Sequence, residues 1–242
     1  MECGAAPARE EGMPAITEGA SKIYHDITLL MDGFTTLEHT IKTATLYKDV
    51  RALIERTTTF YTPTLIVGVN GSAEEYFYQR SDVFRDAKLL RFTPYAQVAA
   101  YARHRMMRPE EDYYFKSLGA SAAKIMQEGG NVTLGAHGNR QGLGAHWEMW
   151  AMAMGGMSPH DVLRAATNIS ASALGLDEDL GSLDVGKVAD LVVLDRNPLD
   201  DIRNTNTVRY VMKNGVLWDG DTMDEVWPQP KKFEGFHWQR LR

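Results

Sequence analysis

The chain has 242 residues and almost no cysteine, because Cys3 is the only one. One thiol cannot form a disulfide within the chain, and it cannot build a zinc site from cysteines. A metal site in this chain therefore has to use histidine, aspartate or glutamate.

Long hydrophobic runs and an excess of basic residues are also missing. No apolar run approaches the roughly 20 residues of a membrane-spanning helix. The start, "MECGAAPAREEG", has no hydrophobic segment of a secretion signal. The net charge of −6 gives no basic surface for nucleic acid. We expect no nucleic-acid or membrane partner and, by default, a cytoplasmic location, although a full-length parent protein could be exported.

Several catalytic signatures are absent. The glycines between residues 135 and 144 do not form a G-x-G-x-x-G or Walker A loop, and "GASAAK" lacks the G-x-S-x-G of a serine-hydrolase elbow. No H-x-H occurs among the seven histidines, which are His25, His39, His104, His137, His146, His160 and His237. Of these, His25, His104, His160 and His237 are most simply surface or packing residues.

The first part of the chain alternates between two periodicities. Apolar segments 13–17, 35–39 and 60–70 are predicted strands, and 20–33 and 47–57 have helical spacing. The third strand is almost continuously β-branched or aromatic, as expected when both faces are buried. This alternation predicts parallel βα units with helices packed outside the sheet.

Residues 71–117 interrupt the alternation with charged and aromatic sequence, which we interpret as a long helical excursion. Such an insertion after a barrel strand can shape a substrate pocket. A solvated surface excursion with aromatic anchors fits the same composition.

The alternation then resumes with a helix over 119–130 and the strand "NVTLGA" from Asn131. A helix over 158–176 begins with Ser158 as its N-cap and Pro159 in its first turn. Between them, "MWAMAMGGM" is predicted to be a core helix.

The C-terminal part is predicted to be a strand, a hairpin and a tail. Segments 188–195 and 208–220 have strand patterns, and Asn214-Gly215 is a strong signal for a type I′ hairpin turn. Residues 221–242 are predicted to be irregular.

Two stretches resemble the amidohydrolase superfamily. "DGFTTLEH" (32–39) is similar to the family's "D-G-x-x-x-(I/L)-E-H". The run from Ser158, which includes "AATNISA", "LGSLDVGKVADLVVLD" and "VRYVMKNG", is similar to its C-terminal helix, strand and hairpin. The members that look most similar are imidazolonepropionase-like and prolidase-like, in a branch often fused to TolB-like propellers.

The resemblance implies an α/β fold, a metal-dependent (β/α)₈ TIM-like barrel beside a small β-sandwich. Such a barrel needs about 250 residues, and only about four βα units are visible here. We therefore expect a partial barrel, about strands five to eight, over 13–180, with the insertion 71–117. A β-sandwich or hairpin segment follows over 181–220, and the irregular tail over 221–242.

The same resemblance implies a divalent metal, Zn, Mn or Fe, if the site is complete. His39 ends the strand implied to be the sixth and is a candidate metal ligand, or a residue that orients substrate. Glu18 stands on the strand implied to be the fifth, beside the place of a missing ligand histidine. It is a candidate carboxylate ligand, or a helix-start glutamate favoured by the helix dipole.

The stretch "NVTLGAHGNRQGLGAHWEMW" (131–150) carries three further candidates. His137 stands at or beside the place of the family's aspartate, as a metal ligand or as the general base for a metal-activated water. His146 and Glu148 are candidate substrate contacts. One of them is expected at the surface if the segment is helical.

Two hypotheses follow for function. The first is an amidohydrolase-type hydrolase that cleaves C–N bonds of small-molecule amides or dipeptides by metal-activated water. The second is a non-catalytic truncated fragment or interaction module, completed by homo-oligomerisation or by an upstream polypeptide. It is motivated by the missing strands one to four, since half a barrel leaves two sheet edges open.

Overall fold

The computed structural model describes residues 5–20, 22–67, 72–102, 108–138 and 140–240. Cys3 and His104 lie outside the described residues, so the prediction for His104 is not addressed.

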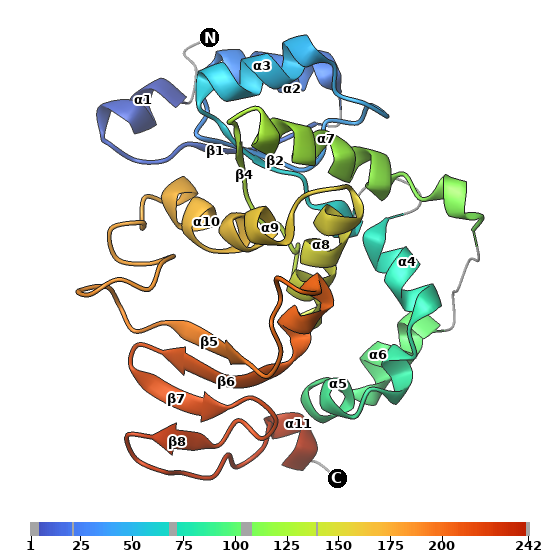
Figure 1. Cartoon of the computed structure of the whole chain (residues 1–242), viewed down its shortest axis with the longest axis vertical. Coiled ribbons are helices and arrows are strands. Elements are labelled where there is room, and N and C mark those ends of the chain that lie inside the picture. Colours follow the sequence, from blue (N-terminus) through green and yellow to red (C-terminus); the bar gives the residue numbers. More distant parts are fainter. Residues whose placement is uncertain (1–4, 21, 68–71, 103–107, 139, 241–242) are drawn as a thin grey trace.

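The fold is a mixture of α and β with two separate four-stranded sheets, and helices lie both between the sheets and on the outer side of the parallel sheet (Figure 1). The parallel sheet has the order β1-β2-β3-β4, with β1 (Ile16–Glu18), β2 (Thr36–Glu38), β3 (Phe60–Thr62) and β4 (Asn131–Val132). The antiparallel sheet has the order β5-β6-β7-β8, with β5 (Leu191–Leu194), β6 (Val208–Lys213), β7 (Val216–Asp219) and β8 (Glu225–Trp227).

The helices connect and cover these sheets. The α-helices are α1 (Ala5–Glu10), α2 (Ile23–Met31), α3 (Lys48–Thr57), α4 (Ala73–Arg80), α5 (Ala87–Phe92), α6 (Tyr95–Ala102), α7 (Phe115–Gln127), α8 (Leu143–Met154), α9 (Pro159–Ala166), α10 (Asn168–Ala173) and α11 (His237–Arg240). Short 3₁₀ helices are η1 (Leu65–Val67), η2 (Val83–Arg85), η3 (Glu110–Asp112) and η4 (Ile202–Asn206). In the described part no helix is both long and apolar enough to cross a membrane.

The parallel sheet forms because its strands offer one continuous apolar row. Leu37, Tyr61 and Val132 are in register on β2, β3 and β4, and each is at most 1% exposed. Side chains alternate along a strand, so Glu18, Glu38 and Thr62 share the opposite face at the carboxyl ends of β1, β2 and β3. The predicted parallel βα units are confirmed.

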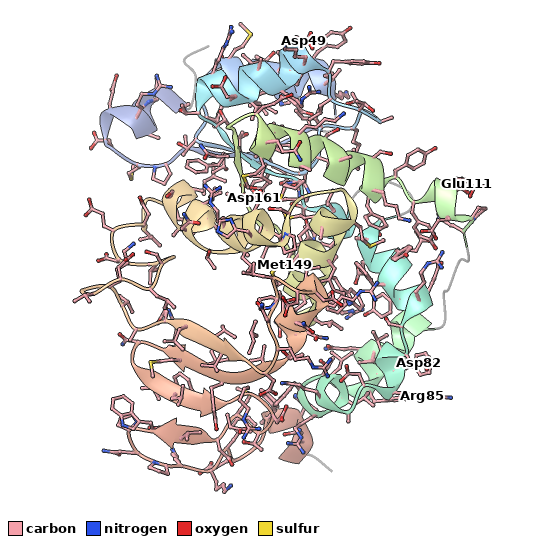
Figure 2. The ribbon with its side chains drawn as sticks, in the orientation of Figure 1. Asp49, Asp82, Arg85, Glu111, Met149 and Asp161 are labelled. Carbon is pink, nitrogen blue, oxygen red and sulfur yellow. The ribbon has the colours of Figure 1, made fainter. Side chains whose placement is uncertain are left out.

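Helix α8 lies in the middle of the molecule, where Figure 2 shows Met149. Trp147 and Met152 of this helix are at most 1% exposed, so the methionine-rich segment is core, as predicted. On one side α8 packs closely against α7, where Gly155 meets Gly119.

The segment after residue 71 forms α4, η2, α5 and α6 at one side of the molecule (Figure 1). Aromatic side chains attach it to α8: Phe77 stacks on Trp147 at 5.6 Å between ring centroids, and Tyr78 meets the same ring edge-on at 5.0 Å. Figure 2 shows Asp82 and Arg85 at the periphery, beyond these anchors. The excursion is therefore helical, as predicted, and it has the aromatic anchors of the surface alternative.

Two turn predictions are confirmed. Asn214 and Gly215 have φ angles of 49° and 78° and join β6 to β7, as a type I′ turn requires. Ser158 caps α9, because its Oγ accepts the N–H of Asp161 at 3.1 Å and Pro159 stands in the first turn.

Three predicted boundaries are wrong. The strand expected over 60–70 ends at Thr62 because Thr64 adopts a φ of 48° and η1 follows; residues 68–70 lie outside the described residues. The helix expected over 158–176 breaks at Thr167, whose hydroxyl donates to the carbonyl of Leu163. The tail expected to be irregular contains the strand β8, which forms because it pairs with β7. It also contains the short helix α11.

Candidate active site at the carboxyl edge of the parallel sheet

Glu18 and His39 meet where two neighbouring parallel strands end. Glu18 is the last residue of β1, His39 directly follows β2, and the register pairs Glu18 with Glu38. Nε2 of His39 lies 3.1 Å from Oε1 of Glu18, with 25% and 76% of these side chains exposed. A carboxylate at this distance fixes the orientation of the imidazole ring and leaves Nδ1 as its second polar atom.

His137 reaches the same place from the loop after β4. Its ring centroid lies 5.4 Å from that of His39, and its side chain is exposed. The structure thus brings together the three predicted ligand residues, Glu18, His39 and His137, although they lie far apart in the sequence.

Both histidines have left-handed backbones, with φ of 70° at His39 and 54° at His137. Residues other than glycine rarely adopt this region, and it costs on the order of 1–2 kcal/mol per residue. Such strained positions cluster at functional sites. The shared strain therefore adds to the case for a site at this edge.

The three side chains do not by themselves form a metal centre. Glu18 contacts His39 and His39 lies beside His137, but within the described ranges no group of three or more His, Cys, Asp or Glu residues could hold a metal ion. The divalent metal that amidohydrolases generally use therefore does not fit the described residues alone. The metal role predicted for Glu18, His39 and His137 requires donors from elsewhere.

His146 lies in the first turn of α8. Its Nδ1 is buried and has no hydrogen-bond partner. Burial lowers the pKa of His146 to about 4, and the nearby charge of Lys88 acts in the same direction. The ring is therefore neutral near pH 7. The segment is helical, yet neither His146 nor Glu148 is exposed, so the expectation that one of them lies at the surface is wrong.

Glu148 lies in the interior of α8 and is 0% exposed. Its Oε1 accepts the N–H of Leu65 and its Oε2 accepts the N–H of Ile66, each at 2.8 Å. Burial raises the pKa of the Glu148 carboxyl to about 8, while the two backbone donors act to lower it. Both oxygens accept backbone N–H groups and the side chain is fully buried, so Glu148 does not present an oxygen to a substrate in this structure.

Sequence reasoning missed the buried cation of the same loop. Arg140 is 7% exposed, with its Nε 3.5 Å from Oε1 of Glu74 and its guanidinium 5.1 Å from the ring centroid of Tyr78. Burial lowers the pKa of Arg140, and Glu74 opposes that shift. The arginine stands in the quoted loop, but its partners on α4 are more than sixty residues away, and no local signal identifies them.

Asp26 was missed for the same reason. It is 1% exposed in α2, and its Oδ1 accepts the N–H of Ala20 at 2.9 Å, just after β1. Burial raises the pKa of Asp26. Asp26 and Glu148 therefore share one arrangement: a buried carboxylate on a helix holds the backbone that follows a parallel strand.

Known proteins with similar sequences and structures share parts of this sequence and this fold. The sequence model of the amidohydrolase family matches residues 107–217. A 5-methylthioadenosine/S-adenosylhomocysteine deaminase of Teredinibacter turnerae is 32% identical over 116 residues, which span 43% of this chain and 26% of the deaminase.

Two solved structures have the same fold. A Xaa-Pro dipeptidase with bound methionine in its active site has a TM-score of 0.62 at 23% identity, covering 89% of this chain and 47% of the dipeptidase. A molinate hydrolase has a TM-score of 0.61 at 21% identity, covering 88% of this chain and 44% of the hydrolase.

The family match and the deaminase support the amidohydrolase superfamily for this chain, as the resemblance predicted, and the solved structures share its fold. The chain spans about half the length of the two solved structures and about a quarter of the deaminase.

Proposed function

We propose that this chain forms the C-terminal half of the barrel of an amidohydrolase-type hydrolase. In this proposal β1 to β4 occupy strands five to eight, residues 13–180 form the half barrel with its insertion at 71–117, and 181–220 belong to the adjoining β-sandwich. The parallel order of the sheet supports it, as does the coverage of 47% of the dipeptidase by 89% of this chain. The remaining strands come from outside the described residues.

The observation that carries the proposal is the contact of Glu18, His39 and His137 at one sheet edge. Ligands bind at the carboxyl ends of the strands in barrels of this kind, and here three strand ends place a carboxylate and two imidazoles together. No other part of the described chain combines these groups at strand ends with left-handed backbones.

The reaction proposed is hydrolysis of a C–N bond in a small amide or dipeptide. Water adds to the carbonyl carbon, the C–N bond breaks, and the nitrogen leaves as an amine after gaining a proton. His137 accepts the proton from the attacking water as a general base. His39, held by Glu18, donates to or orients the substrate carbonyl, and His146 lies nearer the excursion as a substrate contact. The described residues alone do not fit a metal, so no step is assigned to one.

The test is turnover by the purified chain, supplied in turn with Zn, Mn and Fe, on Xaa-Pro dipeptides, other dipeptides and molinate. The first two variants are His39→Asn and His137→Asn, and the matched control is His160→Asn, because His160 is an exposed histidine on α9. We expect wild type and control to hydrolyse at least one substrate, and the two site variants to lose at least about a hundredfold in kcat/KM. Equal rates in wild type and the two site variants overturn the roles of His39 and His137, and no turnover by wild type with any metal overturns the proposed activity of this chain by itself.

One observation favours the second candidate function, a non-catalytic half barrel completed by a partner. In the described part of the chain, β1 and β4 each pair on one side only. Ile16 on the β1 edge is 53% exposed, and Met13, Tyr24 and Met31 nearby are exposed as well. An open edge with apolar side chains is a template for further pairing.

Light scattering distinguishes this candidate from a self-sufficient chain. If the edge is completed by a second copy, the chain is an oligomer, and Ile16→Lys lowers its mass toward that of one chain. Ser158→Ala is the control, since it removes a cap far from the edge. A wild-type monomer at all concentrations contradicts completion by a second copy.

A further inference from the structure

We propose that Glu148 is a positioning residue: it holds the turn after β3, and through that turn it sets the position of His137. The inference rests on the proposed function for the meaning of His137, but its geometry stands by itself. Glu148 touches neither His39 nor His137 in any described contact, so it acts through the backbone.

The first step is the pair of hydrogen bonds between Glu148 and the backbone of η1. Its two carboxylate oxygens accept the N–H groups of Leu65 and Ile66, each at 2.8 Å and in the interior. The first N–H groups of a helical turn have no partner within the turn. A buried carboxylate that satisfies two of them removes the cost of leaving them unpaired. Helix α8 is thereby tied to the end of β3, across 82 and 83 residues of chain.

The second step is the turn itself. Thr64 has a φ of 48°, which directs the chain out of β3 and into η1. The hydroxyl of Thr62 lies 2.6 Å from that of Thr133, just after β4. By holding Leu65 and Ile66, Glu148 therefore also holds Thr62 in its contact with Thr133, where β3 and β4 end.

The third step leads from this turn to the histidine loop. A side chain at Gly135 would place its Cβ 2.6 Å from Cγ2 of Thr62 and closer still to Oγ1 of Thr64. The backbone at Gly135 thus rests directly on the two threonines, and only glycine permits that approach. His137 follows two residues later with its φ of 54°, and its ring lies 5.4 Å from His39.

A second contact supports the same loop from α8. A Cβ at Gly144 would lie 3.4 Å from Cδ1 of Ile66 and 3.6 Å from the carbonyl of Ala136. Gly144, at the start of α8, therefore lies beside both Ile66, which Glu148 holds, and the loop that carries His137. The turn after β3 thus meets the loop directly at Gly135, and α8 meets the loop at Gly144.

The test compares Glu148→Gln with Met152→Ala. Glutamine keeps the volume of Glu148 but offers one acceptor where two donors point. Met152 is a 0% exposed residue of the same helix with no bond to the turn, so Met152→Ala loosens α8 by a cavity. The readouts are the hydrogen-exchange rates of the Leu65 and Ile66 amides and the ring resonances of His137, both followed by NMR.

We expect Glu148→Gln to speed exchange at Leu65 or Ile66 by about tenfold or more, and to shift the His137 ring resonances. Met152→Ala lowers the unfolding temperature but leaves those ring resonances unchanged. If Glu148 acts only on overall stability, amide exchange and the His137 resonances change in the same way in both variants, and that result overturns the proposal. Unchanged His137 resonances in folded Glu148→Gln overturn it as well.

Thr62→Val provides the measurement if Glu148→Gln does not fold. Valine preserves the shape of threonine and removes only the hydroxyl contact with Thr133. We expect the His137 resonances to shift while exchange at Leu65 and Ile66 stays as in wild type; no shift contradicts the path through the turn. These readouts need no turnover, so an inactive wild type overturns the proposed function and leaves this inference to be decided by NMR alone.

Discussion

Nε of Arg140 lies 3.5 Å from Oε1 of Glu74, and only 6% and 13% of these side chains are exposed. This ion pair joins the loop between β4 and α8 to α4. The chain also contains a more exposed counterpart, the pair of Arg51 and Glu128 at 2.8 Å, in which 11% and 41% of the two side chains are exposed. The two pairs allow the effect of burial to be measured within one protein.

Glu74→Gln is expected to lower the free energy of unfolding by about 2–4 kcal/mol, because it leaves the buried Arg140 cation without its carboxylate. Glu128→Gln, at the exposed pair, is expected to cost about 0–1 kcal/mol. Urea unfolding at pH 7 measures both. Equal losses in the two variants would contradict a buried, energetically important Arg140–Glu74 pair.

The buried His146 predicts a loss of stability in acid. Its folded-state pKa is about 4, below the ordinary 6.5, so between these values the unfolded chain binds a proton that the folded chain does not. The stability is complete above pH 6.5 and falls as the pH drops toward 4, by up to roughly 3 kcal/mol.

The contribution of His146 is isolated as the difference between wild type and His146→Gln. We expect this difference in the free energy of unfolding to shrink as the pH falls from 6.5 to 4. His160→Gln serves as the control because His160 is exposed on α9. Parallel pH profiles for wild type and His146→Gln would show that His146 is not held neutral by the fold.

Glu148 predicts a pH dependence at the other end of the range. Its folded-state pKa is raised from 4.5 to about 8, so the folded chain retains a proton that the unfolded chain releases. Its contribution to stability is therefore largest below pH 4.5 and is lost as the pH rises through 8. Glutamine does not titrate, so the stability of wild type relative to Glu148→Gln should decline from pH 5 to pH 8. Denaturant unfolding at four pH values measures this decline, and a constant difference would contradict it.

Local sequence determines those parts of the fold in which the partners are neighbours in the chain. The Asn214–Gly215 turn and the Ser158 cap involve residues at most three positions apart, and both were predictable. The end of β3 was not, because its backbone amides bond to a carboxylate 83 residues away. Likewise, β8 exists only because it pairs with β7.

The same limit applies to the candidate site. The family resemblance predicted that Glu18, His39 and His137 belong to one site, and parallel strands that end at one edge bring them together. The partners of Glu148 and Arg140 depend on tertiary packing, since α8 packs on the turn after β3 and the loop of Arg140 packs on α4. No short motif in the sequence indicates this packing.

The close approach of α7 and α8 predicts the effect of one added methyl group. Gly155 has an ordinary φ of −76°, but a Cβ there would lie 2.6 Å from Cα of Gly119 and 2.7 Å from the backbone nitrogen of Ala120. Backbone atoms of a helix cannot yield as a side chain can, so α8 has to move away from α7. We expect Gly155→Ala to lower the free energy of unfolding by about 1–3 kcal/mol, measured by urea unfolding.

Gly144→Ala is the matched control on the same helix. Its Cβ would meet Cβ of Arg140 and Cδ1 of Ile66 at 3.4 Å, which is ordinary contact, and alanine favours a helix over glycine by up to about 1 kcal/mol. Stability should therefore stay equal or rise. Because α8 carries Glu148, displacement of the helix by Gly155→Ala should also speed exchange of the Leu65 and Ile66 amides, which Gly144→Ala should leave protected. A Gly155→Ala variant as stable and as protected as wild type would show that α7 does not set the position of α8.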